Sequence, residues 1–271
     1  MSPAFWAAVK FISEGLGYSA RGQNLACTYS MDAIQDLMAR NGILVEEDLL
    51  AAAKAYLDRR TDLLNRCVRA SLMTVQEAQA AYENLYPLWR SGGFRCKLPL
   101  NKQKGDKRQV AFFTAIINIL TEDTLRRSPA ARGPLDFDDD PRGMVYVFDG
   151  ENRLVGASSR RFDGAFPSIR NPKMVWEIKE YYYSSTFGSR VADGVYETQL
   201  DGYEFREIAP YAARPVTHVF FLDGYSTWWE DGKSYLCRII DILNAGLVDE
   251  VIVGREVFQR WPELLTAAIL A

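Results

Sequence analysis

Apolar residues recur every three or four positions through the first ninety residues of the chain, which is the spacing of one face of an α-helix. Ser30 is a suitable N-cap for one of these segments, and Thr74 with Glu77 has the spacing of a capping box for another. The predicted helices are residues 4–16, Met31–Arg40, Glu46–Ala70 and a helix from Thr74 to about Trp89. The chain therefore begins with a helical region.

The pattern changes after residue 108, where short apolar runs alternate with segments of helical periodicity. Asp149-Gly150 is a strong signal for a hairpin turn between strands at 144–148 and 153–157. The other predicted strands are Met174–Tyr183, Thr217–Leu222 and Glu250–Val253, and the other predicted helices are Gln109–Arg127, Val191–Ile208, Ser234–Asn244 and Arg255–Ala268. We predict an α/β core, a mixed sheet flanked by helices, over residues 109–271, with an α-helical region over residues 1–108.

The predicted strand Met174–Tyr183 carries charged residues on one face only. Side chains two positions apart in a strand share a face, so Glu177 and Lys179 point the same way, about 7 Å apart along the strand. Met174, Trp176 and Ile178 point the opposite way, toward the expected core. A further acid, Asp163, precedes this strand with thirteen residues between it and Glu177. An acid and an ammonium on the polar face of a strand indicate a metal-dependent site.

Composition narrows the chemistry that this site could perform. The 271 residues include one histidine, which excludes zinc sites built from several histidines and the nucleases that rely on a histidine finger. The net charge of −3 argues against binding of nucleic acid by bulk charge, so any basic cleft must be local. The remaining chemistry uses carboxylates, lysine, water and a hard cation.

The cellular compartment is also constrained by the sequence. The four cysteines are scattered and form no CxxC pair, as expected for reduced thiols of a cytoplasmic protein. No run of 18 apolar residues is present, and the first ten residues lack the pattern of a signal peptide, so we expect no association with a membrane.

Metal-assisted hydrolysis of a phosphodiester requires two acids to hold the metal ion and a positive group near the attacking water. Asp163 and Glu177 could supply the carboxylates, and the backbone carbonyl of Ile178 a third oxygen ligand, for Mg²⁺ or Mn²⁺. Lys179 could orient the water or stabilise the developing charge.

The pattern of Asp163 followed by Glu177-Ile178-Lys179 resembles the PD-(D/E)xK nuclease superfamily, with Phe162 at the position of the proline. That superfamily places the two parts of its motif on the second and third strands of an α-β-β-β-α-β core. Gln199 and Tyr203 on the following helix look like its Q-x-x-x-Y element. Within the superfamily, the chain is most similar to a type II restriction endonuclease.

The resemblance implies a Mg²⁺-dependent endonuclease that cuts double-stranded DNA and leaves a 5′-phosphate. Cutting of both strands requires two active sites, so a homodimer is expected, with the helical region 1–108 serving DNA recognition or dimerisation. The alternatives are a repair or recombination nuclease with the same core, and a non-catalytic DNA-binding α/β protein.

Several further residues are candidates for accessory roles. Glu122, near the end of the predicted helix before the strands, could be an accessory metal ligand or a solvated surface acid. Arg90–Arg108 has seven positive charges and one negative charge, and it could contact phosphates or be a solvated loop. The aspartate-rich stretch Ser128–Arg142 is expected to be a solvated linker. The candidate DNA contacts are Arg95, Lys97, Lys102, Lys104, Lys107, Arg108, Arg161 and Arg170.

Overall fold

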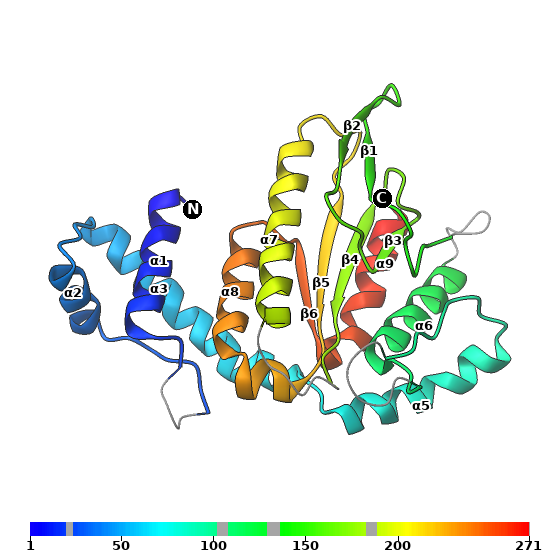
Figure 1. Ribbon diagram of the computed structural model, residues 1–271, viewed down its shortest axis with the longest axis horizontal. Coiled ribbons are helices and arrows are strands. Elements are labelled where there is room, and N and C mark those ends of the chain that lie inside the picture. The colour runs from blue at the N-terminus through cyan, green and yellow to red at the C-terminus, as the bar shows by residue number, and fades with distance from the viewer. Residues whose placement is uncertain (20–23, 102–107, 129–135, 183–188, 271) are drawn as a thin grey trace.

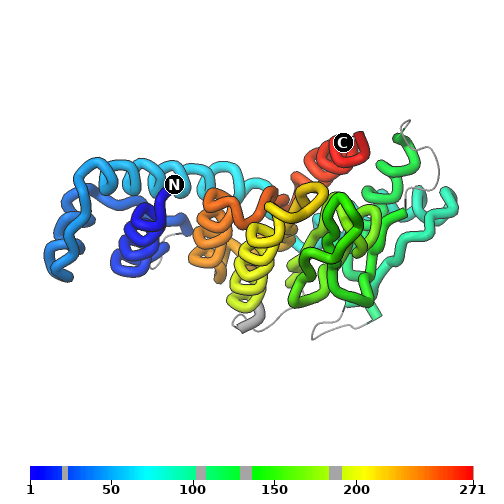
Figure 2. Tube along the Cα trace, turned by 90° about the horizontal axis from the view of Figure 1, so that it is seen from above, coloured from blue at the N-terminus to red at the C-terminus, as the bar shows by residue number. Residues whose placement is uncertain are grey.

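The computed structural model describes residues 1–19, 24–101, 108–128, 136–182 and 189–270. The chain begins with α1 (Pro3–Leu16), α2 (Met31–Arg40) and α3 (Glu47–Leu63), which surround a small apolar core of their own. The hydroxyl of Ser30 caps α2 as predicted. The predicted helix Glu46–Ala70 is built from α3, a π-helical turn at Leu64–Val68 and the short α4 (Arg69–Ser71). Figure 2 shows this helical region at one end of an elongated molecule.

The next two helices, α5 (Val75–Ser91) and α6 (Phe112–Arg127), pack against each other beside the sheet. The predicted capping box of α5 is confirmed, because Thr74 and Glu77 each bind the other's backbone N–H. The helix predicted from Gln109 begins three residues later, since the carbonyl of Gln109 accepts a hydrogen bond from the backbone N–H of Asn101. None of the described helices is both long and apolar enough to span a lipid bilayer.

The core is a mixed α/β fold around a four-stranded sheet, as predicted (Figure 1). The strands lie in the order β3 (Gly164–Phe166), β4 (Met174–Lys179), β5 (Thr217–Leu222) and β6 (Glu250–Val253). The pair β3–β4 is antiparallel, while β4–β5 and β5–β6 are parallel. Parallel neighbours need long crossovers, and α7 (Ser189–Ile208) and α8 (Lys233–Asn244) provide them.

The two faces of this sheet pack against different helices. On one face, Trp176, Phe221 and Ile252 lie in a core that includes α6 and the terminal helix α9 (Arg260–Leu270). On the other face, Phe220 and Leu222 pack with α7 and α8. The prediction that Met174, Trp176 and Ile178 point into the core is confirmed, but all six residues of β4 are buried because both faces are covered.

Three further predicted elements differ from the structure. The hairpin of β1 (Tyr146–Phe148) and β2 (Leu154–Ala157) forms a separate two-stranded sheet, and the unpredicted strand β3 takes the place beside β4. The predicted strand Met174–Tyr183 ends at Lys179, because the next residues turn to bind α6 and the loop after β5. The predicted helix Arg255–Ala268 begins with a 3₁₀ segment, Gly254–Phe258, and continues as α9.

A buried ion pair joins the helical region to the core. Nη1 of Arg60 on α3 lies 2.8 Å from Oδ2 of Asp241 on α8. Tyr56 donates a hydrogen bond of 2.6 Å to the same carboxylate, and Arg60 donates another to Ser13 on α1 at 2.9 Å. The guanidinium of Arg60 therefore links three helices, α1, α3 and α8, at a buried ion pair.

Replacing Arg60 by methionine should lower the free energy of unfolding by about 3–5 kcal/mol, because the carboxylate of Asp241 then stays buried without its cation. Urea denaturation measures this change. The control is Arg66→Met, which breaks an exposed ion pair with Asp62 and should cost less than about 1 kcal/mol. Equal losses in the two variants would contradict the assigned role of Arg60.

Candidate functional site

Glu177 and Lys179 lie on the face of β4 that is covered by α7. Nζ of Lys179 is 2.5 Å from Oε1 of Glu177 and 3.1 Å from Oε2 of Glu197 on α7. Both strand residues are buried, with exposed fractions of 6% and 8%. Gly194 permits this close approach, since a Cβ there would lie 2.8 Å from Cε of Lys179.

Asp163 lies beside Glu177, directly before β3. Its backbone N–H donates to the carbonyl of Trp176 at 3.0 Å, the residue that is paired with Gly164 in the β3–β4 ladder. Its carboxylate accepts a hydrogen bond from the backbone N–H of Ile178, the residue after Glu177, and its charge acts on Glu177. The structure thus brings together the three residues Asp163, Glu177 and Lys179 of the predicted motif.

β4 extends beyond the point where its pairing with β3 ends, and the backbone of Ile178 lies in this part, which is not paired with β3. Its N–H donates a hydrogen bond of 2.7 Å to Oδ2 of Asp163. The N–H and C=O of one strand residue point to the same edge, so the carbonyl of Ile178 faces the side on which Asp163 lies. Two carboxylates and one carbonyl are hard oxygen donors, the type that Mg²⁺ prefers. This donor set fits a magnesium ion.

The site contains a second cation, Arg160, that was not part of the predicted motif. Nη2 of Arg160 is 3.0 Å from Oε2 of Glu177 and 3.6 Å from Oε2 of Glu197, and its Nε is 3.3 Å from Oδ2 of Asp201. Glu197 and Asp201 are four positions apart on α7 and therefore share one helix face. The sequence signal that could have identified Glu197 and Asp201 is their spacing of four positions on the helix that follows the strand bearing Glu177 and Lys179.

The predicted accessory pair on α7 occupies different faces of the helix from these acids. Tyr203 is 48% exposed and its ring centroid lies 5.7 Å from Cζ of Arg206. Gln199 is half-buried. The α7 side chains in contact with Lys179 and Arg160 are Glu197 and Asp201.

Burial shifts the pKa values of the acids upward. Burial, together with the charge of Asp163, raises the pKa of Glu177 to about 8, while Lys179 and Arg160 oppose this rise. Burial raises the pKa of Asp201 to about 7, again against the pull of Arg160. Burial alone would lower the pKa of Lys179, but Glu177, Tyr181 and Glu197 together outweigh it and hold that pKa above its usual value. Lys179 therefore stays protonated at neutral pH.

Glu122 lies elsewhere in the molecule. It belongs to α6, which covers the opposite face of the sheet from Glu177 and Lys179. Its carboxylate accepts hydrogen bonds from the backbone N–H groups of Arg95 and Cys96 and pairs with Arg126 at 2.6 Å. It thus holds the segment before α6 in place.

The basic and acidic stretches predicted as separate loops contact each other. Arg95 pairs with Asp136 at 3.0 Å, and Nζ of Lys97 lies 3.4 Å from Asp139 and 3.2 Å from Asp140. The remaining candidate DNA contacts within the described residues, Arg108, Arg161 and Arg170, are exposed. Lys102, Lys104 and Lys107 lie outside the described residues.

A second pair of acids, half-buried Glu180 and buried Asp223, follows β4 and β5 but has a structural role. Glu180 accepts hydrogen bonds from the backbone N–H groups of Phe113 and Thr114, at the N-terminus of α6. Asp223 accepts hydrogen bonds from the backbone of Tyr181 and the indole of Trp228. These carboxylates tie the strand ends to the surrounding helices.

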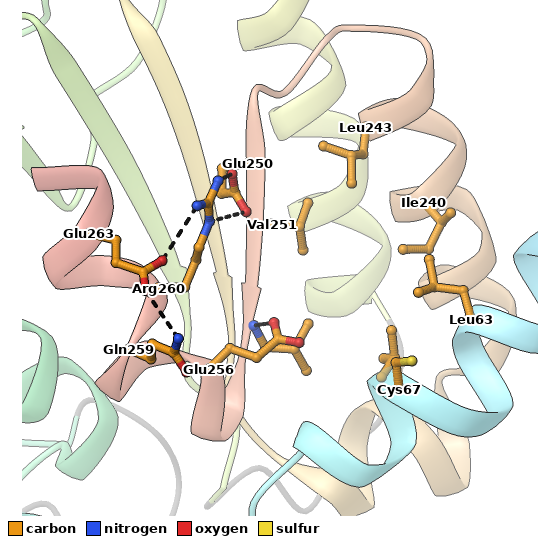
Figure 3. Close-up of a pocket in the computed structure, with 12 residues that line it drawn as sticks. Leu63, Cys67, Ile240, Leu243, Glu250, Val251, Glu256, Gln259, Arg260 and Glu263 are labelled. Carbon is orange, nitrogen blue, oxygen red and sulfur yellow. Dashed lines mark hydrogen bonds and ion pairs between the residues drawn. The ribbon is translucent and has the colours of Figure 1, made fainter. Parts of the chain in front are cut away.

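A groove of about 390 Å³ runs along the outer edge of β6, away from the site on β4 (Figure 3). Leu63, Ile240 and Leu243 line one wall, while Glu250, Arg260 and Glu263 line the other. Arg260 pairs with Glu250 at 2.7 Å, so the charges of this wall are partly matched within it.

Among the described residues, no group of three or more histidine, cysteine or acidic side chains is arranged as a metal site.

The variant Asp201→Asn tests how much the buried carboxylate of Asp201 lowers the free energy of unfolding. Because burial raises the pKa of Asp201 to about 7, the folded protein holds this proton to a higher pH than the unfolded chain does. The resulting stability is present at low pH and is lost as the pH rises through about 7. Asparagine does not titrate, so the variant should gain stability relative to the wild type by about 1.4 kcal/mol per pH unit between about pH 5 and 7.

Urea denaturation at several pH values measures this difference. Asp193→Asn, which removes an exposed charge from the same helix, controls for the change in net charge. A difference between the Asp201 variant and the wild type that stays constant across this pH range would contradict the assignment.

Comparison with known proteins identifies two family models and no characterised relative. No curated protein and no solved structure matches the chain. Residues 1–67 match the model described as Domain of unknown function (DUF7690), which covers α1, α2 and α3. Residues 73–268, more than half of the chain, match a second model, which covers α5, the sheet and the site on β4. The chain therefore belongs to the family described as Domain of unknown function (DUF7687).

Proposed function

We propose that this protein is a Mg²⁺-dependent endonuclease that hydrolyses phosphodiester bonds in double-stranded DNA, of the restriction type. The observation that carries the proposal is the convergence of Asp163, Glu177 and Lys179 where β3 begins its pairing with β4. This arrangement agrees with the resemblance to the PD-(D/E)xK nucleases. The helix α6 before the strands and the crossover α7 to a parallel strand agree with the same core.

The carboxylates of Asp163 and Glu177, with the carbonyl of Ile178, would hold Mg²⁺ or Mn²⁺. When bound, such an ion polarises the phosphate and lowers the pKa of a coordinated water. The chain's own contribution is to hold both acids through the β3–β4 pairing, with the N–H of Ile178 fixing one oxygen of Asp163.

Lys179 acts in this proposal as a charged hydrogen-bond donor. Its pKa is held above the usual value by Glu177, Tyr181 and Glu197, so its ammonium keeps its proton instead of acting as a base. It can orient the attacking water or donate to a phosphate oxygen as negative charge develops there. The oxygen of the attacking water bonds to phosphorus as the bond between phosphorus and the 3′ oxygen breaks. In net, the water gives its hydroxyl to the 5′-phosphate and a proton to the 3′ oxygen, which leaves as a 3′-hydroxyl.

We expect exposed basic residues near the β3–β4 edge of the sheet to contact the DNA backbone. Arg161 lies two residues before Asp163, and Arg170 lies in the turn between β3 and β4, with its Cζ 4.1 Å from the centroid of Phe148. Arg95 and Lys97 already pair with acids, so they are weaker candidates. Cleavage of both strands by a single-site chain requires a homodimer. We expect the protein to act on DNA in the cytoplasm.

Lys179→Met should reduce the rate of DNA cleavage by about 100- to 1,000-fold, the usual effect of losing one donor to a developing charge. The assay incubates purified protein with unmethylated plasmid in Mg²⁺ or EDTA and follows discrete fragments. Lys173→Met is the matched control, since it removes a lysine that precedes the same strand and donates to the carbonyl of Ala268. Cleavage should persist in this control.

The products of the assay separate the alternatives. Discrete fragments that require Mg²⁺ and Lys179 support the restriction-type enzyme. Degradation from DNA ends would indicate a repair or recombination nuclease with the same core. Binding of DNA without cleavage would indicate a non-catalytic protein, and cleavage unaffected by Lys179→Met would contradict the assigned site.

A further inference from the structure

We propose that Arg160 is a cation switch of the candidate metal site. Its guanidinium neutralises Glu177 while no metal ion is bound, and it moves fully onto Asp201 and Glu197 when a divalent cation binds. The inference rests on the proposed function, because it concerns occupation of the same site. It identifies a positioning residue that controls the affinity for the metal ion.

The balance of charge in the site supports this exchange. Four acids, Asp163, Glu177, Glu197 and Asp201, surround two cations, Lys179 and Arg160. When all are ionised, the acids exceed the cations by two charges, which equals the charge of one divalent cation. A metal ion at Asp163 and Glu177 would complete this balance, while Arg160 would still have two carboxylates on α7 to pair with.

Buried polar atoms of Arg160 and Asp201 lack hydrogen bonds, while Nη1 of Arg160 donates one of 3.1 Å to Oε2 of Glu177. Asp201 is fully buried, and within the described part of the chain neither of its carboxylate oxygens has a hydrogen-bond partner. Nε and Nη2 of Arg160 are also buried without a hydrogen bond, although both lie within ion-pair distance of an acid. A guanidinium can make two parallel hydrogen bonds to one carboxylate. A shift of Arg160 toward Asp201 would pair these atoms with one another.

The segment that carries Arg160 is anchored, so the side chain is the part that moves. The carbonyl of Arg160 accepts a hydrogen bond of 2.7 Å from the hydroxyl of Ser158, and the backbone N–H of Ser159 donates one of 3.0 Å to Glu204 on α7. The side chain itself is 21% exposed, which leaves room for a change of rotamer.

Binding of Mn²⁺ to the full chain without DNA, measured by calorimetry with Mg²⁺ as competitor, tests the switch. Arg160→Gln should bind Mn²⁺ about tenfold more tightly, because the metal ion no longer displaces a close charge partner of Glu177. Asp201→Asn should bind it about tenfold more weakly, because the displaced guanidinium loses its alternative partner. Arg153→Gln, which removes an exposed arginine of the β1–β2 hairpin with the same change in charge, should leave the affinity unchanged.

The double variant separates the switch from a simple effect of charge. In the Arg160→Gln background, Asp201→Asn should weaken Mn²⁺ binding by much less than tenfold, because no guanidinium remains to be relocated. Arg160→Lys, which keeps the charge but lacks the planar fork, should retain the fold and bind Mn²⁺ with intermediate affinity.

The outcomes distinguish failure of the switch from failure of the proposed function. Binding of Mn²⁺ that depends on Glu177 but not on Arg160 would overturn the switch and leave the nuclease proposal standing. An equal effect of Asp201→Asn with and without Arg160 would also overturn the switch. Absence of Mn²⁺ binding in both the wild type and Arg160→Gln at millimolar concentrations would overturn the metal site itself.

Discussion

Two charged side chains on a strand that is covered on both faces impose the main constraint on this structure. Removing a charge from water is costly unless a partner of opposite charge lies close to it. The buried pair of Glu177 and Lys179 therefore requires further charges from elsewhere in the chain. The loop before β3 supplies Arg160, and α7 supplies Glu197 and Asp201. The position of α7 over the sheet thus depends on electrostatics as well as on apolar packing.

Sequence periodicity was sufficient to predict the part of this site that lies within the single strand β4. Alternation along β4 correctly assigned Trp176 and Ile178 to the core and Glu177 and Lys179 to the other face. The strand β3 was missed because Gly164–Phe166 is three residues long and begins with a glycine, too little for a period of two to be recognised. The capping box at Thr74 was recognised because all of its contacts lie within one turn.

The unpredicted members of the site depend on contacts between distant segments. Arg160 meets Asp201 across forty residues, and that contact exists only because α7 packs on β4 with a particular rotation. The pairing of Lys97 with Asp139 is of the same kind, so a basic stretch and an acidic stretch that looked independent compensate each other. Composition indicates the type of each charge, but only the fold determines its partner.

Gly164 links this site to the opposite face of the sheet. Any side chain at that position would overlap the indole of Trp176, since a Cβ would lie 2.0 Å from its Cε2 atom. A slip of β3 by one residue would bring either Asp163 or Ala165 against the ring and turn Asp163 to the wrong face. The indole belongs to the apolar core formed with α6 and α9, where it packs on Trp261. The position of the Asp163 carboxylate therefore depends on packing in the core. Core substitutions that contact no charged residue would shift it.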